Sequence, residues 1–471
     1  MQTTAISSQA MYEKRWIALA LLCAAQFMVI MDTSIIGVAL PAIKADLGYT
    51  QSGLQWIFNA YVILFGGILL LGGRMSDLFG ARKIFMWGFA ILAAASFLAG
   101  AATSPEVLNM GRAVQGLGSA LIAPAAMTLL MTTFPDPKEL GKAFGFWGAS
   151  AAAGGSAGVF LGGIITEWMD WRWVFYINIP IALIVLFLSK NYLLAGNKSR
   201  GKVDWTGAIL VTASLILLVY AIVSAESAGW ASLQTIGLLA IAIVLFSLFI
   251  ALQKRQQSPL LPLAIFKVFN LSAGNIVMAL MAAAWIPLWF YLNLYLQQIL
   301  HLNAFNSGLA LLPMTITIMI LMVGFTGKLV AKYGFKANLL AGLAFLTISL
   351  ILFSTVSANG TFVGSVLPAS LLGAVGMSLA YIPGTMAAIS GAKPEETGLA
   401  SGIVNTSYQV GSALGLAVIV AISAAVTKGS IANGYNDVDA LNAGFRTAFI
   451  SAAILSGCAI LISVFKIKQP K

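Results

Sequence analysis

Two charged side chains, Asp32 and Arg112, lie inside long apolar stretches of the sequence and are the residues best placed to do chemistry. An ionised aspartate at the middle of a membrane costs about 2.5–3.5 kcal/mol on insertion scales, so it must be paired, face a wet cavity or be protonated. All three conditions suit a group that takes up and releases a proton, because its pKa responds to its exposure. Asp32 is therefore a candidate proton carrier. The alternative is an aspartate that only braces neighbouring helices.

The two charges are expected at the same depth. Asp32 precedes Pro41, the expected outer end of the first helix, by nine residues, or roughly 13 Å. Arg112 follows Pro105, the outer start of the fourth, by seven residues, or roughly 10 Å. We expect a pair or a water-linked relay, in which Arg112 favours ionised Asp32 until a proton or a cationic substrate competes. A static buried ion pair is the alternative.

The composition places these stretches in a membrane. Of the 471 residues, 60% are hydrophobic and 9% are charged, whereas a soluble domain carries about 25% charged residues. Apolar runs of about 20 residues, the length that spans the hydrocarbon layer, recur along the chain. The first run, 16–41, is too long for a signal-peptide core. Two cysteines, Cys23 and Cys458, and one histidine, His301 in a short loop, exclude a disulfide framework or a metal cluster.

The apolar runs predict fourteen spanning helices, at 16–40, 53–71, 84–102, 107–130, 143–165, 173–194, 205–225, 232–252, 270–296, 306–330, 337–357, 362–390, 398–425 and 444–465. Of the 26 basic residues, 21 fall in the termini and even-numbered loops. The others are Arg112 and, on the opposite side, Lys44, Arg172, Lys428 and Arg446. This division predicts cytoplasmic termini and explains the net charge of +11 without nucleic acid.

Two segments, 72–83 and 326–337, share a pattern. Gly73, Asp77, Gly80 and Arg82 recur 254 residues later as Gly327, Ala331, Gly334 and Lys336, so the spacing is kept while the acid is lost. Similar loops at matching places predict a repeated architecture of two six-helix halves. We therefore expect an N-terminal bundle over 1–200, two inserted helices over 201–255 and a C-terminal bundle over 256–471.

Several motifs carry a family resemblance. QFMVIMDTSIIGVALPAI at 26–43 has an Asp-Thr pair followed by Ala-Leu-Pro, 72–83 reads GGRMSDLFGARK, 112–118 fits Arg-x-x-Gln-Gly-x-Gly, and 171–180 reads WRWVFYINIP. In these motifs and their order the sequence resembles the major facilitator superfamily, and specifically its fourteen-helix drug:proton antiporter branch. One departure is in the fifth helix, where Gly158 is followed by Val159 instead of the family's proline.

The resemblance implies an all-α polytopic protein with two six-helix bundles and two extra helices between them. It implies a bacterial inner-membrane exporter of lipophilic, drug-like compounds, with cations as one candidate class. Such a carrier works by alternating access, is driven by the proton gradient, needs no cofactor and is expected to be a monomer. In the family the 72–83 loop clamps the halves in one state, which implies gating roles for Gly73, Asp77, Gly80 and Arg82. The alternative is that the charges of this loop only anchor it on the cytoplasmic side.

Polar and aromatic side chains inside the spans are candidates for substrate binding. Amides at mid-span face a cavity or another helix more often than lipid, and a cavity of apolar and aromatic groups suits flat lipophilic molecules. The candidates are Gln26, Gln55, Asn59, Trp285, Trp289, Asn293, Tyr381, Asn405 and Gln409. For Trp and Tyr near span ends, the interfacial aromatic belt is the alternative.

Other functions find less support in the sequence. A proton-linked carrier of one endogenous metabolite could use the same scaffold with a narrower cavity. An enzyme would need a catalytic set at membrane depth, and no His-rich, paired-acid or Ser/His/Asp arrangement occurs there. A channel would need filter segments. ATP-driven transport would need a P-loop, and no G-x-x-x-x-G-K-[ST] string occurs.

Overall fold

The computed structural model describes residues 14–51, 53–195, 204–256, 259–392 and 397–469. Within these ranges the regular structure is helical, and no β-strand is present. Twelve helical segments of the described chain are long and apolar enough to cross a membrane. The protein is therefore a multi-pass membrane protein.

Every predicted span contains a helix. In chain order the elements are α2 (Arg15–Leu47), α3 (Gln55–Phe79), α4 (Ala81–Gly100), α5 (Pro105–Thr133), α6 (Pro137–Trp168), α7 (Trp173–Tyr176), α8 (Asn178–Tyr192), α9 (Trp205–Ala228), α10 (Leu233–Arg255), η1 (Leu263–Lys267), α11 (Leu271–Leu294), η2 (Tyr295–Ile299), α12 (Ala304–Leu321), η3 (Met322–Thr326), α13 (Gly327–Ser354), η4 (Phe362–Val366), α14 (Leu367–Ile389), α15 (Thr397–Ala432) and α16 (Asp437–Lys466).

Two details of the prediction are wrong at the helix ends. The first helix does not stop at Pro41 but continues through it to Leu47, because a proline removes only one backbone hydrogen bond and a helix can carry it. The segment 72–83 is not an open loop: α3 and α4 are separated by Gly80 alone. The charged residues of this segment continue the helix beyond the apolar layer. The helix ends only at Gly80, whose φ of 94° suits glycine.

The segment 326–337 has the same construction. Gly334, the counterpart of Gly80, has φ 77° and interrupts α13 with non-helical backbone. Two residues after each glycine, a basic side chain reaches the end of another helix. Arg82 Nη1 donates to the carbonyl of Lys190 at 3.1 Å, and Lys336 Nζ donates to that of Val464 at 2.9 Å. The sequence match at an offset of 254 therefore coincides with matching backbone and contacts.

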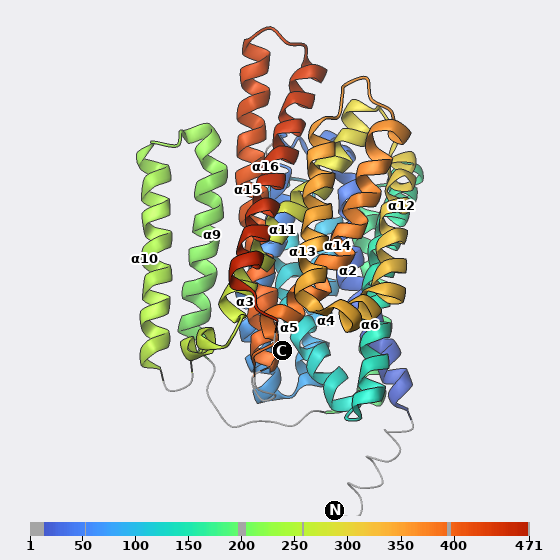
Figure 1. The fold of residues 1–471 in the computed structure, drawn as a ribbon, viewed down its shortest axis with the longest axis vertical. Helices are drawn as coiled ribbons and strands as arrows, with labels where there is room; N and C mark the ends of the chain where they lie inside the picture. The colour runs from blue at the N-terminus through green and yellow to red at the C-terminus, as the bar shows by residue number, and fades with distance from the viewer. Residues whose placement is uncertain (1–13, 52, 196–203, 257–258, 393–396, 470–471) are drawn as a thin grey trace, which may run out of the picture.

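The helices pack in neighbouring groups. Among the first seven helices, α2 packs on α6, and α5 packs on both α3 and α4. Among the last helices, α13 packs on α14 and α16, and α11 packs on α15 and α16. The pairs α6–α12 and α3–α15 join the early helices to the late ones. In Figure 1 the hairpin of α9 and α10 stands at one side of the molecule, where α9 contacts α3 and α15.

Small residues allow the closest of these approaches. A Cβ atom added to Gly154 or to Gly158 of α6 would lie 2.4 Å from the Phe27 carbonyl oxygen or 2.8 Å from Ser34 Cβ, both of α2. On another face of α6, a Cβ atom added to Gly308 of α12 would lie 2.7 Å from the carbonyl oxygen of Val159. Glycines at these positions let the helix backbones touch, and such close van der Waals packing contributes to helix association in lipid.

Candidate functional site

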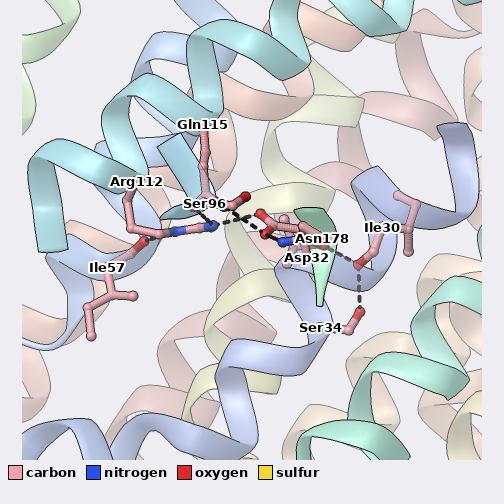
Figure 2. Close-up of polar contacts among 9 residues, drawn as sticks. Ile30, Asp32, Ser34, Ile57, Ser96, Arg112, Gln115 and Asn178 are labelled. Carbon is pink, nitrogen blue, oxygen red and sulfur yellow. Dashed lines mark hydrogen bonds and ion pairs between the residues drawn. The ribbon is translucent and has the colours of Figure 1, made fainter. Parts of the chain in front are cut away.

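A buried carboxylate lies at the centre of the first group of helices. Asp32 of α2 is 1% exposed, and Arg112 of α5 is fully buried. Arg112 Nη1 donates to Asp32 Oδ2 at 2.6 Å, so the contact predicted from their depths is present (Figure 2). Gln115, one turn further along α5, donates from Nε2 to Asp32 Oδ1 at 3.1 Å. The i, i+3 spacing of Arg112 and Gln115 places both donors on one face of α5.

Arg112 has further partners besides the carboxylate. Its Nε donates to the carbonyl of Ile57 at 3.0 Å, and its Nη1 also donates to Gln115 Oε1 at 2.8 Å. The guanidinium carbon lies 4.4 Å from the centre of the Tyr61 ring, in cation–π geometry. These groups can hold the guanidinium in place when the carboxylate is neutral.

Asn178 is a third donor to Asp32 and is not among the residues predicted from the sequence. This side chain at the start of α8 is fully buried and donates from Nδ2 to Asp32 Oδ1 at 2.6 Å (Figure 2). Its own Oδ1 is buried and has no hydrogen-bond partner among the described residues. The signal that could have found Asn178 is an amide inside the apolar motif at 171–180.

The carboxylate of Asp32 accepts three hydrogen bonds from the described side chains, one on Oδ2 and two on Oδ1. Gln115 completes the shell with a second bond from Nε2 to Ser96 Oγ at 2.8 Å. Donors on both oxygens and a guanidinium at 2.6 Å complement an ionised carboxylate. The arrangement can therefore store a negative charge at a depth where an unpaired one would be costly.

The structure brings some of the predicted substrate-binding residues together in pairs. Asn59 Nδ2 of α3 donates to Gln55 Oε1 at 3.4 Å, and both side chains are buried. On α11 the rings of Trp285 and Trp289 meet edge to face at 6.1 Å between centroids. Asn293 donates to the Trp289 carbonyl at 2.8 Å. It also touches α2, since a Cβ added to Gly37 would lie 2.9 Å from its Nδ2.

The other four candidates are more dispersed. The ring centroids of Tyr381 in α14 and Tyr408 in α15 lie 5.5 Å apart. Tyr408 was not among the predicted residues. Gln409 packs its Cβ against Gly66 of α3, so it lies at the contact between the early and late helices. Gln26 of α2 is half-buried, and Asn405 of α15 is exposed.

The predicted gating residues lie around the end of α3. Gly73 is helical, and an added Cβ would have Pro124 at 3.7 Å as its nearest neighbour. Arg82 Nη1 donates to the carbonyls of Lys190 and, at 3.0 Å, of Leu193, at the end of α8. The side chain of Asp77 lies outside the described part of the structure. So does the side chain of Glu226, which stands at the end of the predicted span 205–225 and is the reserve candidate for a proton-carrying acid in the sequence.

A second buried carboxylate, which no sequence pattern indicated, fixes the base of the α9–α10 hairpin. Asp204 caps α9 by accepting from the Gly207 N–H at 2.7 Å, and it accepts from Gln253 Nε2 of α10 at 2.7 Å. Gln256 Nε2 and the Leu260 N–H add bonds of 3.1 and 3.3 Å. Burial by itself would raise the pKa of Asp204, but these four hydrogen bonds outweigh it and leave the pKa lowered.

One end of the molecule is closed by polar contacts between early and late helices. Gln297 in the π-helical turn η2 donates from Nε2 to the carbonyl of Val38 in α2 at 2.9 Å. Gln51, just before α3, and Gln298 pair through their amides at 3.3 Å. These contacts join the end of α2 and the start of α3 to the end of α11.

A carboxylate adds to this closure. Glu167, near the end of α6, accepts from Asn303 Nδ2 at 3.0 Å and from the Ala304 N–H at 3.2 Å. Ala304 is the first residue of α12, so the negative group sits at a helix N-terminus, where it is favoured. His301, in the short loop before α12 as predicted, has φ 52° and is exposed.

Comparison with known proteins gives consistent matches along the chain. The family model of the Major Facilitator Superfamily matches residues 22–416. The cephamycin export protein CmcT of Amycolatopsis lactamdurans is 35% identical over 427 residues, covering 89% of this chain and 88% of that protein. The puromycin resistance protein pur8 of Streptomyces alboniger is 34% identical over 425 residues, covering 89% and 84%.

Solved structures show the same fold at low sequence identity. An auto-inhibited peptide transporter of the POT family superposes with a TM-score of 0.67 over 96% of this chain and 98% of its own, at 16% identity. The nucleoside transporter NupG gives a TM-score of 0.65 over 95% of this chain and 99% of its own, at 12% identity.

Proposed function

The chain belongs to the Major Facilitator Superfamily, and from this we propose that it exports lipophilic, drug-like compounds across a bacterial plasma membrane in exchange for protons. The relatives that match most of its length carry names for export of, or resistance to, antibiotics. The observation that carries the proton-coupling part is the fully enclosed pair of Asp32 and Arg112.

The proposed architecture has fourteen spanning helices. The apolar run Ala304–Ser354 is 51 residues long, or roughly 76 Å as a straight helix, more than twice the hydrocarbon thickness of about 30 Å. Its break at Gly334 supports two spans. The 25 residues of α3 are also long enough to cross. Six helices before the α9–α10 hairpin and six after it match the proposed bundles 1–200 and 256–471, with both termini cytoplasmic.

We assign Asp32 as the group that takes up the proton. Among the acids whose side chains are described, only Asp32 and Asp204 are buried, and Asp204 serves as a helix cap. Protonation removes the charge that holds Arg112 Nη1 at 2.6 Å. The guanidinium then keeps Ile57, Gln115 and Tyr61 as partners. The proton therefore changes which helix Arg112 is held to, and this links protonation to helix position.

Asn178 supplies a partner for either state of Asp32. In this structure its Nδ2 donates to the ionised carboxylate, while its Oδ1 is buried without a partner. A protonated carboxyl must instead donate, and turning the Asn178 amide about its terminal bond presents Oδ1 as the acceptor. The Asn178 amide can therefore pair with Asp32 in both protonation states, so that no buried donor is left without a hydrogen-bond partner.

Alternating access requires one gate on each side of the membrane. The contacts between early and late helices support a closed gate on the outer side. In the proposed orientation the contacts of Gln51, Gln297 and Glu167 lie on the outer side. On the cytoplasmic side, Arg82 ties the α3–α4 junction to α8. We propose that Gly73, Asp77, Gly80 and Arg82 bias the conformational equilibrium and do not touch substrate.

Substrate contact is proposed for the aromatic and amide groups placed above. The paired rings of Trp285 and Trp289, and of Tyr381 and Tyr408, offer flat apolar faces that also attract cations. Asn293, buried against Gly37 with an unpartnered Oδ1, adds a polar point on the α2 side. Few polar groups among aromatic ones suit lipophilic compounds of varied shape.

Transport by purified protein in liposomes tests the function. When the compartment that corresponds to the cell exterior is made acidic, the protein should move a lipophilic cationic dye such as ethidium into that compartment. A protonophore should abolish the movement, and added ATP should have no effect. Dye movement that is unchanged by the protonophore would refute proton exchange. Movement of one metabolite class with no dye at all would favour the metabolite carrier instead.

A further inference from the structure

An apolar groove of about 500 Å³ lies between the inserted helix α9 and the helices α3, α4 and α5. Trp87 and Ile91 of α4 form one wall, and Trp205, Ala213 and Ile216 are on the α9 wall. None of these residues belongs to the Asp32 centre or to the proposed substrate contacts. The groove is thus a separate feature of the inserted hairpin.

The packing of α9 explains why the groove exists. The outer half of α9, including Leu215 and Val219, is buried in an apolar cluster with side chains of α3 and α15. At Thr212 the helix touches α3, because a Cβ added to Gly67 would lie 2.9 Å from Thr212 Oγ1. Below this contact α9 has no comparable packing on α4 or α5. The inner half of the helix therefore lines an opening instead of a closed interface.

The lining restricts the occupant to an apolar chain. Thr212 is the one lining residue with an aliphatic polar side chain, and its Oγ1 is buried toward Gly67 without a hydrogen-bond partner among the described atoms. From Trp205 to Ile216 the α9 wall rises roughly 16 Å, about half of the 30 Å hydrocarbon layer. The groove therefore has the length of one leaflet.

The cytoplasmic end of the groove offers a cation and two indoles. Trp87 and Trp205 are 47% and 54% exposed, and tryptophan favours the headgroup level of a membrane. Lys83 lies at the start of α4 with its ammonium nitrogen 4.9 Å from the Trp87 ring centre. Asp204, held by four hydrogen bonds, fixes the position of the neighbouring Trp205. An amine beside an apolar slot complements a phosphate attached to an acyl chain.

We propose that this groove is a binding site for an anionic phospholipid of the cytoplasmic leaflet, with an acyl chain between α9 and α4 and the headgroup phosphate at Lys83. The lipid fills the gap beside the Thr212 contact and so completes the packing of α9 against α4 and α5. The site depends on the proposed orientation of the chain but not on proton coupling or on drug export.

Native mass spectrometry of the purified full chain tests the site, with phosphatidylglycerol and phosphatidylcholine of equal chain length as probes. The wild type should retain one phosphatidylglycerol molecule more tightly than any other bound lipid molecule. Lys83→Ala should reduce the preference for phosphatidylglycerol over phosphatidylcholine about fivefold. Ala213→Phe, which fills the groove, should remove the tight adduct. Ala240→Phe, on an exposed position of α10, is the matched control and should retain it.

Quenching by phosphatidylglycerol with brominated acyl chains avoids a bulky substitution. The quenched share of the tryptophan fluorescence should fall in a Trp87→Phe/Trp205→Phe variant. An unchanged share, or full retention of the tight adduct by a folded Ala213→Phe variant, would overturn the proposal. Displacement of the bound lipid by ethidium would also overturn it, since the groove would then belong to the substrate path.

Discussion

Replacing Asp32 with asparagine separates the proton-coupling role from a structural one when it is combined with a change at Arg112. The carboxylate accepts from Arg112 on Oδ2 and from Gln115 and Asn178 on Oδ1. An asparagine has one acceptor oxygen and an NH₂ group, so in either orientation at least one donor faces another donor. It also leaves the fully buried Arg112 without a counter-charge.

The structure sets the size of the effect. Removing one partner of a buried ion pair costs about 3–5 kcal/mol, because the remaining charge is uncompensated. Tyr61 and the Ile57 carbonyl offset part of this cost, since both already contact the guanidinium. Asp32→Asn should therefore lower the free energy of unfolding of the protein by an amount near the lower end of that range. In Asp32→Asn/Arg112→Gln both charges are gone, and stability should return to within about 1–2 kcal/mol of wild type.

Two measurements on the same preparations distinguish the roles. Thermal unfolding in detergent should show the loss in the single variant and its recovery in the double variant. In liposomes, dye accumulation driven by a pH gradient should be absent from both variants, while dye exchange without a gradient should persist in the double variant. Glu139→Gln, which removes a partly exposed ion pair with Arg15, serves as the control and should transport like wild type.

One result would refute the reasoning. If the double variant accumulates dye against its gradient at the wild-type rate, with equal protein in the membrane, Asp32 is structural. Proton coupling would then have to be sought at another acid, with Glu226 as the next candidate.

Three further changes test other parts of the structure. Asn178→Leu removes both a donor to the Asp32 carboxylate and the acceptor proposed for its protonated form, so gradient-driven dye accumulation should fall while dye exchange without a gradient persists; accumulation at the wild-type rate would contradict the role of the amide. Gly80→Ala should lower stability by about 1–3 kcal/mol because φ is 94°, while Gly73→Ala, with its nearest neighbour at 3.7 Å, should cost little; equal unfolding temperatures would contradict this. Asp204→Asn should destabilise by about 1–3 kcal/mol at neutral pH. Because the pKa of Asp204 is lowered from 3.8, its contribution is complete above that pH and is lost as the pH falls through the folded value, so the unfolding temperatures of wild type and variant should converge in acid.

The sequence by itself determined the class of protein and the order of the helices along the described chain. Apolar runs of spanning length leave no alternative to membrane helices, because the bilayer offers no partner for an exposed backbone group. The depths of Asp32 and Arg112 could also be predicted, since a helix advances a fixed distance for each residue. Counting residues from the expected helix ends gave similar depths for the two charges, and the structure joins them directly at 2.6 Å, although α2 continues past Pro41.

Only the tertiary structure decided which other groups complete the site. Asn178 is 146 residues from Asp32 in the chain, and Asp204 is 49 residues from Gln253. No periodicity within one helix reports such a contact, because it depends on how separate helices rotate and pack. The pairing of Tyr381 with Tyr408 and the groove beside α9 have the same origin. Sequence gives each helix its depth in the membrane, whereas the rotation and separation of the helices, which decide what faces what, arise from packing between them.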